Sequence, residues 1–428
     1  MAQPASSAPA LPGPGAYDGA LGRSIIAIHR WAVHQGLCGA PAEMVFEGLC
    51  RRLLEAGVPL WRAFAGGHTL HPQWGGYSYT WLRDGGAVDP VQRERGEDYD
   101  RSLRISPFAA MMRDARSSTE RSSWPRFRRR LVGPEARLDF PILQELAAAG
   151  VTDYFAQTVR FGEGEDPSRG IGIGYSFATD RAQGFSGDDL MLIEAVLPAA
   201  SLAIMCQGGH TIASGLLAAY VGDDAGRRVH AGAVERGSVE TIQAVLWLAD
   251  IRGFTAIADF WAGLVVIELL DDVFEALCAP LRSRGGQVLK FLGDGLLAIF
   301  PFDDGSRRDT CRRALDAAAE AMRSLDRLNA ARRAAGKPTA EVDLALHLGE
   351  VLYGNVGAVD RLDFTVIGPA VNEVSRIELL CEPLGRRALV SAALAAASGD
   401  SLRLEPLGRH ALRGVREPRE IYALQPGS

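Results

Sequence analysis

The run VLKFLGDGLLAIF occupies residues 288–300 of the 428-residue chain. Apolar residues flank its Gly-Asp-Gly triplet, a pattern that predicts a hairpin of two buried strands with Asp294 in the turn. A second aspartate, Asp250, ends the apolar run VLWLAD and precedes a turn at Gly253. Taken singly, each aspartate is more typical of a turn residue that hydrogen-bonds its own backbone. Together they place hard anionic oxygens on rigid strand ends, as a two-metal phosphoryl-transfer site requires.

Strands alternate with long helices around these aspartates, from Glu240 onward. The pattern predicts strands at 244–248, 342–348 and 364–367, the last two joined by a glycine-rich connection, and helices at 263–282, 307–335 and 370–381. This order predicts an α+β sandwich in which helices cover one side of a sheet. The turn at Gly253 opens a helix, and free N–H groups at a helix start favour phosphate binding.

The segment LDFTVIGPAVNEVSRIELL, residues 362–380, carries a third group of polar residues. If this segment ends in a helix, Asn372 and Arg376 lie four residues apart and project from one face. Arginine stabilises charge that develops on a phosphate, and asparagine orients a sugar hydroxyl or ring oxygen. The alternative is an ordinary amphipathic helix in which Glu373 and Glu378 pair with Arg376.

Five stretches of this half match one known family in order and spacing. They read LADIRGFT (248–255), VLKFLGDGLLAIF (288–300), HLGEVLYGNVG (347–357), RLDFTVIGPAVNEVSRIE (361–378) and LGRHALRGVREPREIYAL (407–424). The chain resembles the catalytic domain of class III nucleotidyl cyclases over about Glu240 to Leu424, a little under half its length. The resemblance implies a ferredoxin-like sandwich at residues 240–428 and an adenylate cyclase, which converts ATP to 3′,5′-cyclic AMP and pyrophosphate.

The resemblance also implies which residues bind metal and phosphate. Asp250 and Asp294 would hold two divalent metal ions, Mg²⁺ or Mn²⁺, and the Ile251 carbonyl would assist one of them. Arg413 matches, more loosely, a basic position that contacts the terminal phosphate. Three residues of one turn would hold the β- and γ-phosphates: Gly253, Phe254 and Thr255.

Four further positions match residues that bind the nucleoside and stabilise the transition state. Asn372 would position the ribose, and Arg376 would neutralise charge on the α-phosphate. Lys290 matches the adenine-reading lysine; an ammonium only donates hydrogen bonds, which suits the acceptor ring nitrogen of adenine. Thr365 falls where many members have Asp, and its hydroxyl can accept from the adenine amino group. Threonine here resembles the subgroup of bacterial cyclases that includes bicarbonate-stimulated members.

In this family the site lies between two cyclase domains, one supplying the aspartates and the other the base-reading, ribose and transition-state residues. This chain holds one copy of every element, which implies a head-to-tail homodimer with two equivalent sites. Two alternatives remain open. A guanylate cyclase is disfavoured by Lys290, and a catalytically silent nucleotide-binding module is disfavoured because no metal aspartate, asparagine or arginine is lost.

The run FSGDDLMLIEAVLPAASLAI, residues 185–204, gives the main information on the N-terminal half. Ser186 is placed as a helix N-cap with acidic residues in the first turn. The run resembles the end of a GAF domain. A start near Leu21 implies a GAF-like α/β sensor domain at 21–207, and an unrelated α/β regulatory domain is the alternative.

The remaining segments complete the predicted domain organisation. Residues 1–20, rich in Pro, Ala, Gly and Ser, are predicted to form a flexible tail. Two glycines at 208–209 interrupt the helical pattern, so residues 208–239 are predicted to form a helical linker. This linker would carry an unknown small-molecule or protein signal from the sensor domain into the cyclase dimer.

Composition and charge exclude several classes of protein. The net charge of −6 gives no general footprint for nucleic acid. The six scattered cysteines fit reduced thiols in a cytoplasmic protein. The apolar segment 190–206 contains Glu194 and Pro198 and predicts a buried helix without membrane insertion. The arginine run at 128–130 predicts a solvated face flanked by nearby acids: Glu97, Asp98, Asp100 and Glu135.

Overall fold

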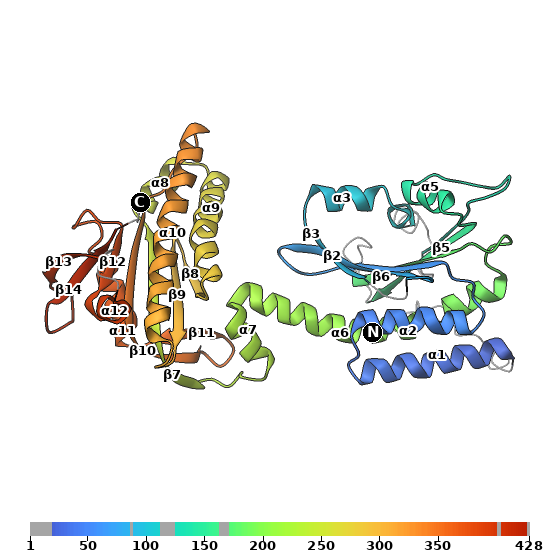
Figure 1. Ribbon diagram of the computed structural model, residues 1–428, viewed down its shortest axis with the longest axis horizontal. Coiled ribbons are helices and arrows are strands. Elements are labelled where there is room, and N and C mark those ends of the chain that lie inside the picture. Colours follow the sequence, from blue (N-terminus) through green and yellow to red (C-terminus); the bar gives the residue numbers. More distant parts are fainter. Residues whose placement is uncertain (1–18, 86–88, 112–124, 162–170, 400–403, 426–428) are drawn as a thin grey trace, which may run out of the picture. The chain divides into compact units, whose positions relative to one another are not determined.

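The computed structural model describes residues 19–85, 89–111, 125–161, 171–399 and 404–425. The chain divides into two compact units, Met1–Leu216 and Leu217–Ser428, and Figure 1 colours it from blue at the N-terminus to red at the C-terminus. The tail predicted over residues 1–20 lies outside the described residues except for its last two positions. The predicted domain limits at residues 20, 207 and 239 stay predictions.

A six-stranded sheet forms the centre of the N-terminal unit. Its strands are β1 (Arg62–His68), β2 (Trp74–Leu82), β3 (Asp89–Glu94), β4 (Arg126–Arg130), β5 (Asp153–Phe161) and β6 (Ile171–Thr179). They pair in the order β3-β2-β1-β6-β5-β4, and every pair is antiparallel. Because side chains alternate across a strand, Ile173, Tyr175 and Phe177 of β6 all face the same buried core.

Helices cover both faces of this sheet (Figure 1). They are α1 (Ala20–Leu37), α2 (Ala42–Glu55), α3 (Glu97–Arg104), α5 (Pro141–Ala148) and α6 (Gly187–Val221). α1, α2 and α6 share one core with the sheet, and α5 packs into a second core with β4 and β5. α1 and α6 approach closely, since a Cβ on Gly36 would lie 3.1 Å from the Cα of Ala203.

α6 begins with a capping box and runs without a break to Val221. The Asp189 N–H donates to the Ser186 hydroxyl at 3.2 Å, and the Ser186 N–H donates to the Asp189 carboxylate at 2.7 Å. The predicted N-cap is confirmed. The predicted interruption at Gly208 and Gly209 is wrong, because glycine weakens a helix by about 1 kcal/mol but still adopts helical angles.

α6 is also, among the described residues, the one helix long and apolar enough to cross a bilayer by length and composition. Its most apolar window is 56% buried inside the structure. Core helices of soluble proteins have the same property, so the expectation of no membrane insertion stays a prediction.

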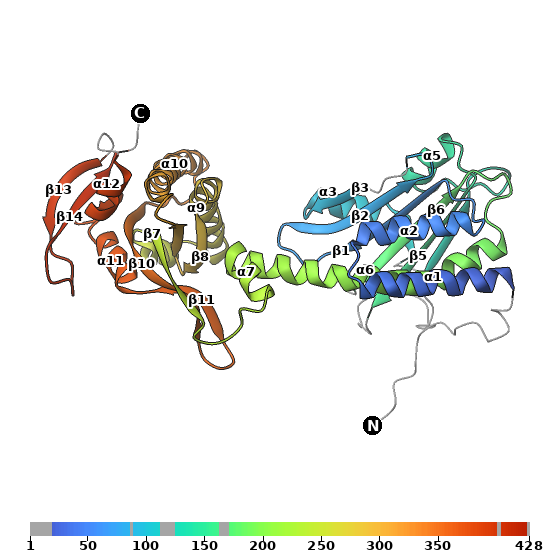
Figure 2. The same cartoon turned by 60° about the horizontal axis from the view of Figure 1, so that its bottom comes forward.

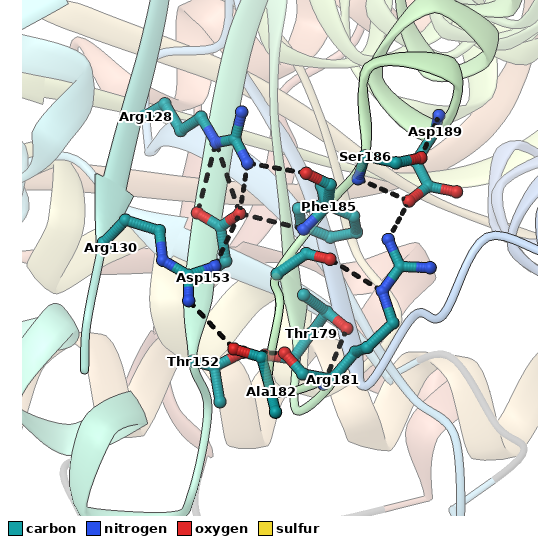
Figure 3. A network of polar contacts seen from close by, with 11 residues as sticks. Arg128, Arg130, Thr152, Asp153, Thr179, Arg181, Ala182, Phe185, Ser186 and Asp189 are labelled. Carbon is teal, nitrogen blue, oxygen red and sulfur yellow. Dashed lines mark hydrogen bonds and ion pairs between the residues drawn. The ribbon is translucent and has the colours of Figure 1, made fainter. Parts of the chain in front are cut away.

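The arginine run on β4 is bound by acids from other segments (Figure 3). Nη2 of Arg128 lies 2.7 Å from the carboxylate of Asp153, which is fully buried. The same carboxylate accepts the Phe185 N–H at 2.9 Å, just before α6. Arg129 pairs with Asp139 at 3.0 Å. The acids predicted to flank the run are therefore not its partners, because the partners depend on strand pairing and chain reversal rather than on nearness in sequence.

Replacing Asp153 with asparagine is expected to lower the free energy of unfolding of the N-terminal unit by about 3 kcal/mol, since it removes one partner of a buried ion pair. Asp139→Asn is the matched control: Asp139 is 43% exposed in its pair with Arg129, and its loss should cost less than about 1 kcal/mol. Urea denaturation of the full-length variants, followed by circular dichroism, measures both. Equal midpoints for the two variants would contradict the assigned role of Asp153.

The C-terminal unit contains an eight-stranded sheet. Its strands are β7 (Val239–Ile251), β8 (Gln287–Leu292), β9 (Gly295–Phe302), β10 (Val342–Gly357), β11 (Leu362–Ile367), β12 (Ala388–Ser391), β13 (Leu404–His410) and β14 (Arg419–Leu424). The order is β13-β14-β12-β10-β7-β9-β8, with β11 paired to β10. Its central part, β10-β7-β9-β8, has the strand order of a ferredoxin-like βαββαβ unit, as predicted.

Helices pack on both faces of this sheet, which corrects the prediction of a sheet covered on one side. They are α7 (Asp223–His230), α8 (Phe254–Phe260), α9 (Gly263–Ser283), α10 (Arg307–Ala334), α11 (Pro369–Glu378) and α12 (Ala392–Ser398). Val245 and Trp247 of β7 face α9 and α10, whereas Ala244 and Leu246 face α11. A strand that is apolar at consecutive positions is buried on both faces.

β10 continues to Gly357. The sequence predicted that this strand would end at Leu348 and that a glycine-rich connection would follow. Instead, β10 forms a hairpin with β11 (Figure 2). A Cβ on Gly354 would lie 2.1 Å from the carbonyl oxygen of Ser238, so only glycine permits this close approach of β10 to the start of β7. The glycines here extend a strand instead of ending it.

Candidate active site

Asp250 and Asp294 meet at one end of the sheet in the C-terminal unit. Asp250 lies one residue before the end of β7, and Asp294 occupies the turn between β8 and β9. Asp250 pairs in register with Gly295, where a Cβ would lie 2.8 Å from the Asp250 carboxylate. Glycine at 295 therefore leaves room for the carboxylate. Burial, with the charge of Asp294 as a second cause, raises the pKa of Asp250 to about 6.

Two carboxylates are suitable ligands for a hard divalent cation, but they are too few to form a metal site made of protein ligands alone. Mg²⁺ prefers carboxylate and carbonyl oxygens and usually keeps positions for water and substrate phosphates. The described residues contain no group of three or more His, Cys, Asp or Glu able to hold a metal ion by themselves. Asp250, Asp294 and the Ile251 carbonyl form an incomplete set of oxygen ligands, which water and substrate phosphates would complete around a bound cation.

A bidentate ion pair supports the turn that follows Asp250. Nε of Arg252 lies 3.0 Å from the carboxylate of Asp343, and the Arg252 N–H donates to the Glu341 carbonyl at 2.8 Å. Asp343 stands directly opposite Asp250 in the β7–β10 ladder. The sequence prediction missed Arg252 and Asp343, because only the register of two distant strands brings them together.

The turn predicted to hold phosphates is open. Gly253 has φ +66°, in the left-handed region that favours glycine, and it precedes α8 without a side-chain cap. A Cβ there would meet nothing within 4 Å, and Thr255 is exposed. The Ala256 N–H already donates to the Gly253 carbonyl at 3.1 Å, which leaves the N–H groups of Phe254 and Thr255 as the candidates for binding phosphate.

Lys290 lies on β8 and Thr365 on β11, and Lys290 contacts a residue of β11 that was not predicted. Nζ of Lys290 is 2.6 Å from the carboxylate of Asp363, two residues before Thr365. The sequence could have indicated Asp363, because residues two apart on a strand share a face and Thr365 was already a predicted site residue. The sequence could not indicate that Lys290 is the partner of Asp363.

Asn372 and Arg376 lie one turn apart on α11, as predicted. Nη1 of Arg376 donates to the carbonyl oxygen of Arg413 at 2.8 Å, so the predicted phosphate-binding arginines are neighbours. The alternative was that Arg376 pairs with acids of its own helix. Among the described residues, Glu373 pairs instead with Arg419 at 3.3 Å. Burial, with added repulsion from Asp250 and Asp343, raises the pKa of Glu378 to about 7.

The contacts of the predicted residues centre on three places in the C-terminal unit: Asp250 with Asp294, Lys290, and Arg376. Glu378, on the same helix as Arg376, is close enough to Asp250 for the Asp250 charge to raise its pKa. Within the described part of the chain, no hydrogen bond or ion pair joins Asp250 or Asp294, the two predicted metal ligands, to Asn372 or Arg376. The functional roles of all these residues stay predictions.

Comparison with known proteins finds a family that this unit matches. Residues 238–426 match the family model of the adenylate and guanylate cyclase catalytic domain. An adenylate cyclase of Anabaena cylindrica is 33% identical over 162 residues, which cover 37% of this chain and 31% of that protein. Adenylate cyclase 1 of Rhizobium meliloti is 31% identical over 176 residues, covering 40% and 26% respectively. The match spans less than a third of the length of either relative.

Among solved structures, the guanylyl cyclase Cya2 is 26% identical and covers 44% of this chain and 93% of its own, with a TM-score of 0.38. The family match covers the C-terminal stretch that carries the paired aspartates. Residues 238–426 are therefore similar to the catalytic domain of adenylate and guanylate cyclases.

Proposed function

We propose that this protein is an adenylate cyclase that converts ATP to 3′,5′-cyclic AMP and pyrophosphate. The observation that carries the proposal is the pairing of Asp250 with Asp294 at adjoining strand ends in a domain of the cyclase family. Relatives named adenylate cyclases support it.

Asp250, Asp294 and the Ile251 carbonyl would hold two divalent ions, Mg²⁺ or Mn²⁺. When bound, such ions stabilise charge on phosphate oxygens as Lewis acids. The open turn at 253–255 would bind the terminal phosphates through its N–H groups. In the reaction the ribose 3′-oxygen forms a bond to the α-phosphorus, the bond from that phosphorus to pyrophosphate breaks, and the hydroxyl proton is lost to solvent.

Arg376 and Asn372 would act on the other side of the reacting phosphate. The Arg376 guanidinium supplies planar, charged donors for α-phosphate oxygens, and its hydrogen bond to the Arg413 carbonyl holds it in place. Asn372, one turn earlier on α11, would orient the ribose so that its 3′-oxygen faces the phosphorus.

Lys290 is the reason for proposing ATP rather than GTP. Its ammonium only donates, and the ring nitrogen that adenine offers is an acceptor where guanine carries an N–H. Thr365, of the threonine-type subgroup, would take part in reading the base.

Each site is proposed to need two copies of the chain in a head-to-tail homodimer. The single copy of each cyclase element in this chain supports this arrangement, because the two halves of each site would then come from two copies of the chain.

The N-terminal unit is proposed to regulate the cyclase in response to a small-molecule or protein signal, as a GAF-like α/β domain. Its six-stranded sheet with helices on both faces and its capped, continuous α6 support a sensor of this kind. We place the protein in the cytoplasm, without a nucleic-acid partner, because its net charge is −6 and its cysteines are scattered.

Full-length protein given ATP or GTP separately, with Mg²⁺ or Mn²⁺, is expected to make cyclic AMP at least about tenfold faster than cyclic GMP, since base-reading hydrogen bonds reject a mismatched base by an order of magnitude or more. Chromatographic separation of the products measures both rates. Faster formation of cyclic GMP would make the protein a guanylate cyclase. Tight ATP binding without either product would make it a nucleotide-binding module.

A further inference from the structure

The ammonium of Lys290 contacts a carboxylate that has no assigned role. Nζ of Lys290 lies 2.6 Å from Oδ2 of Asp363, and the two side chains are 31% and 56% exposed. The pair joins β8 to β11, which are not neighbours in the sheet. Side chains make this contact, because no backbone hydrogen bonds pair the two strands. The contact lies at the position where the base would bind.

Asp363 and Thr365 share one face of β11, because side chains two residues apart on a strand point the same way. Phe364 and Val366 point in the opposite direction, into the core shared with α11. Thr365 is 7% exposed, and its hydroxyl is buried without a hydrogen-bond partner in the described residues. Asp363 is thus the residue on this face whose polar atoms reach both Lys290 and solvent.

Ion pairing changes what Lys290 can do for a bound base. A free lysine has a flexible four-carbon stem and must lose that freedom when it binds a ligand. An ammonium has three donors, so one can bind Asp363 while the others remain for a ring nitrogen. The carboxylate also compensates the positive charge next to a neutral base, which lowers the cost of covering the ammonium.

We propose that Asp363 is a positioning residue for base selection, which holds the Lys290 ammonium where it donates to adenine. This proposal rests on the proposed adenylate cyclase function. A lysine released from Asp363 would also reach the O6 acceptor of guanine, so loss of Asp363 weakens ATP binding and the preference for ATP together. Asp363 does not act on the reacting phosphate, so turnover at saturating ATP stays nearly unchanged.

Steady-state kinetics of full-length variants test this role. Asp363→Asn is expected to raise the KM for ATP about tenfold, the effect of losing one well-placed charged hydrogen bond, with kcat within about twofold and a lower ratio of ATP to GTP specificity. Asp363→Glu keeps the charge and should recover most of the loss. Glu268→Gln is the matched control, because Glu268 forms a comparable exposed ion pair with Lys337 on another surface of the unit.

A double-mutant comparison separates positioning from a general structural effect. In a Lys290→Ala background, Asp363→Asn should cause no further rise in KM, because the residue through which it acts is gone. The proposal is overturned if Asp363→Asn behaves like Glu268→Gln, or if it raises KM equally with and without Lys290. If wild-type protein makes no product, the proposed function fails instead, and calorimetric titration of ATP into the same variants then tests the positioning role by Kd.

Discussion

Asparagine at position 250 or 294 is expected to reduce cyclic AMP formation by about a thousandfold, the scale of removing one preorganised charged group from a phosphoryl-transfer site. Asn keeps the size of the side chain but removes the negative charge that holds a divalent cation. The two carboxylates are adjacent, and the charge of Asp294 contributes to the raised pKa of Asp250. Initial rates with Mg²⁺ and with Mn²⁺ measure the loss.

The stability of Asp250→Asn distinguishes a catalytic loss from a folding defect. Because the pKa of Asp250 in the folded protein is about 6, above its ordinary value, the folded state binds this proton more tightly than the unfolded chain does. Keeping the carboxylate ionised near pH 8 therefore costs stability, and Asp250→Asn should unfold at the same temperature as wild type or higher. Asp309→Asn, in an exposed pair with Arg313, is the control that should keep full activity. Retention of more than a tenth of wild-type activity by Asp250→Asn would contradict the metal-binding role.

Two inactive variants are expected to restore activity when they share a dimer. Arg376→Ala and Asp250→Ala should each lose nearly all activity, because each removes a group from every site. In a mixed dimer one site carries both defects and the other carries neither, so a purified heterodimer with two different tags should recover about half of wild-type activity. The rate of cyclic AMP formation by the doubly purified protein measures this.

The matched control combines two defects from the same half of the site. A heterodimer of Asp250→Ala with Asp294→Ala should stay inactive, because both aspartates of a site come from one copy and each site then lacks one of them. Equal recovery in both mixtures, or recovery in neither, would contradict a site built from two chains.

Local physics allowed much of the catalytic unit to be predicted from sequence. The Gly-Asp-Gly triplet between two apolar runs favours a hairpin, and the predicted hairpin of β8 and β9 is confirmed. The helical spacing of Asn372 and Arg376 is confirmed for the same reason, since a helix places residues four apart on one face. The five matching stretches identified the cyclase domain, and the family match over residues 238–426 supports it.

Glycine misled the sequence prediction twice, in α6 and in β10. Gly208 and Gly209 lie within a continuous helix, and Gly354 lies within a strand. Glycine permits a turn but does not require one, so its conformation is decided by the hydrogen bonds and packing of its neighbours.

Charged partners were decided only by the tertiary structure. Lys290 and Asp363 are 73 residues apart in sequence, and Arg252 and Asp343 are 91 apart. The sequence alone determined which residues carry charge and where most strands, turns and helices of the catalytic unit lie, because those properties depend largely on near neighbours. Which acid meets which base, and that Asp250 adjoins Asp294, depends on strand register and chain reversal, which only the packing of the whole domain specifies.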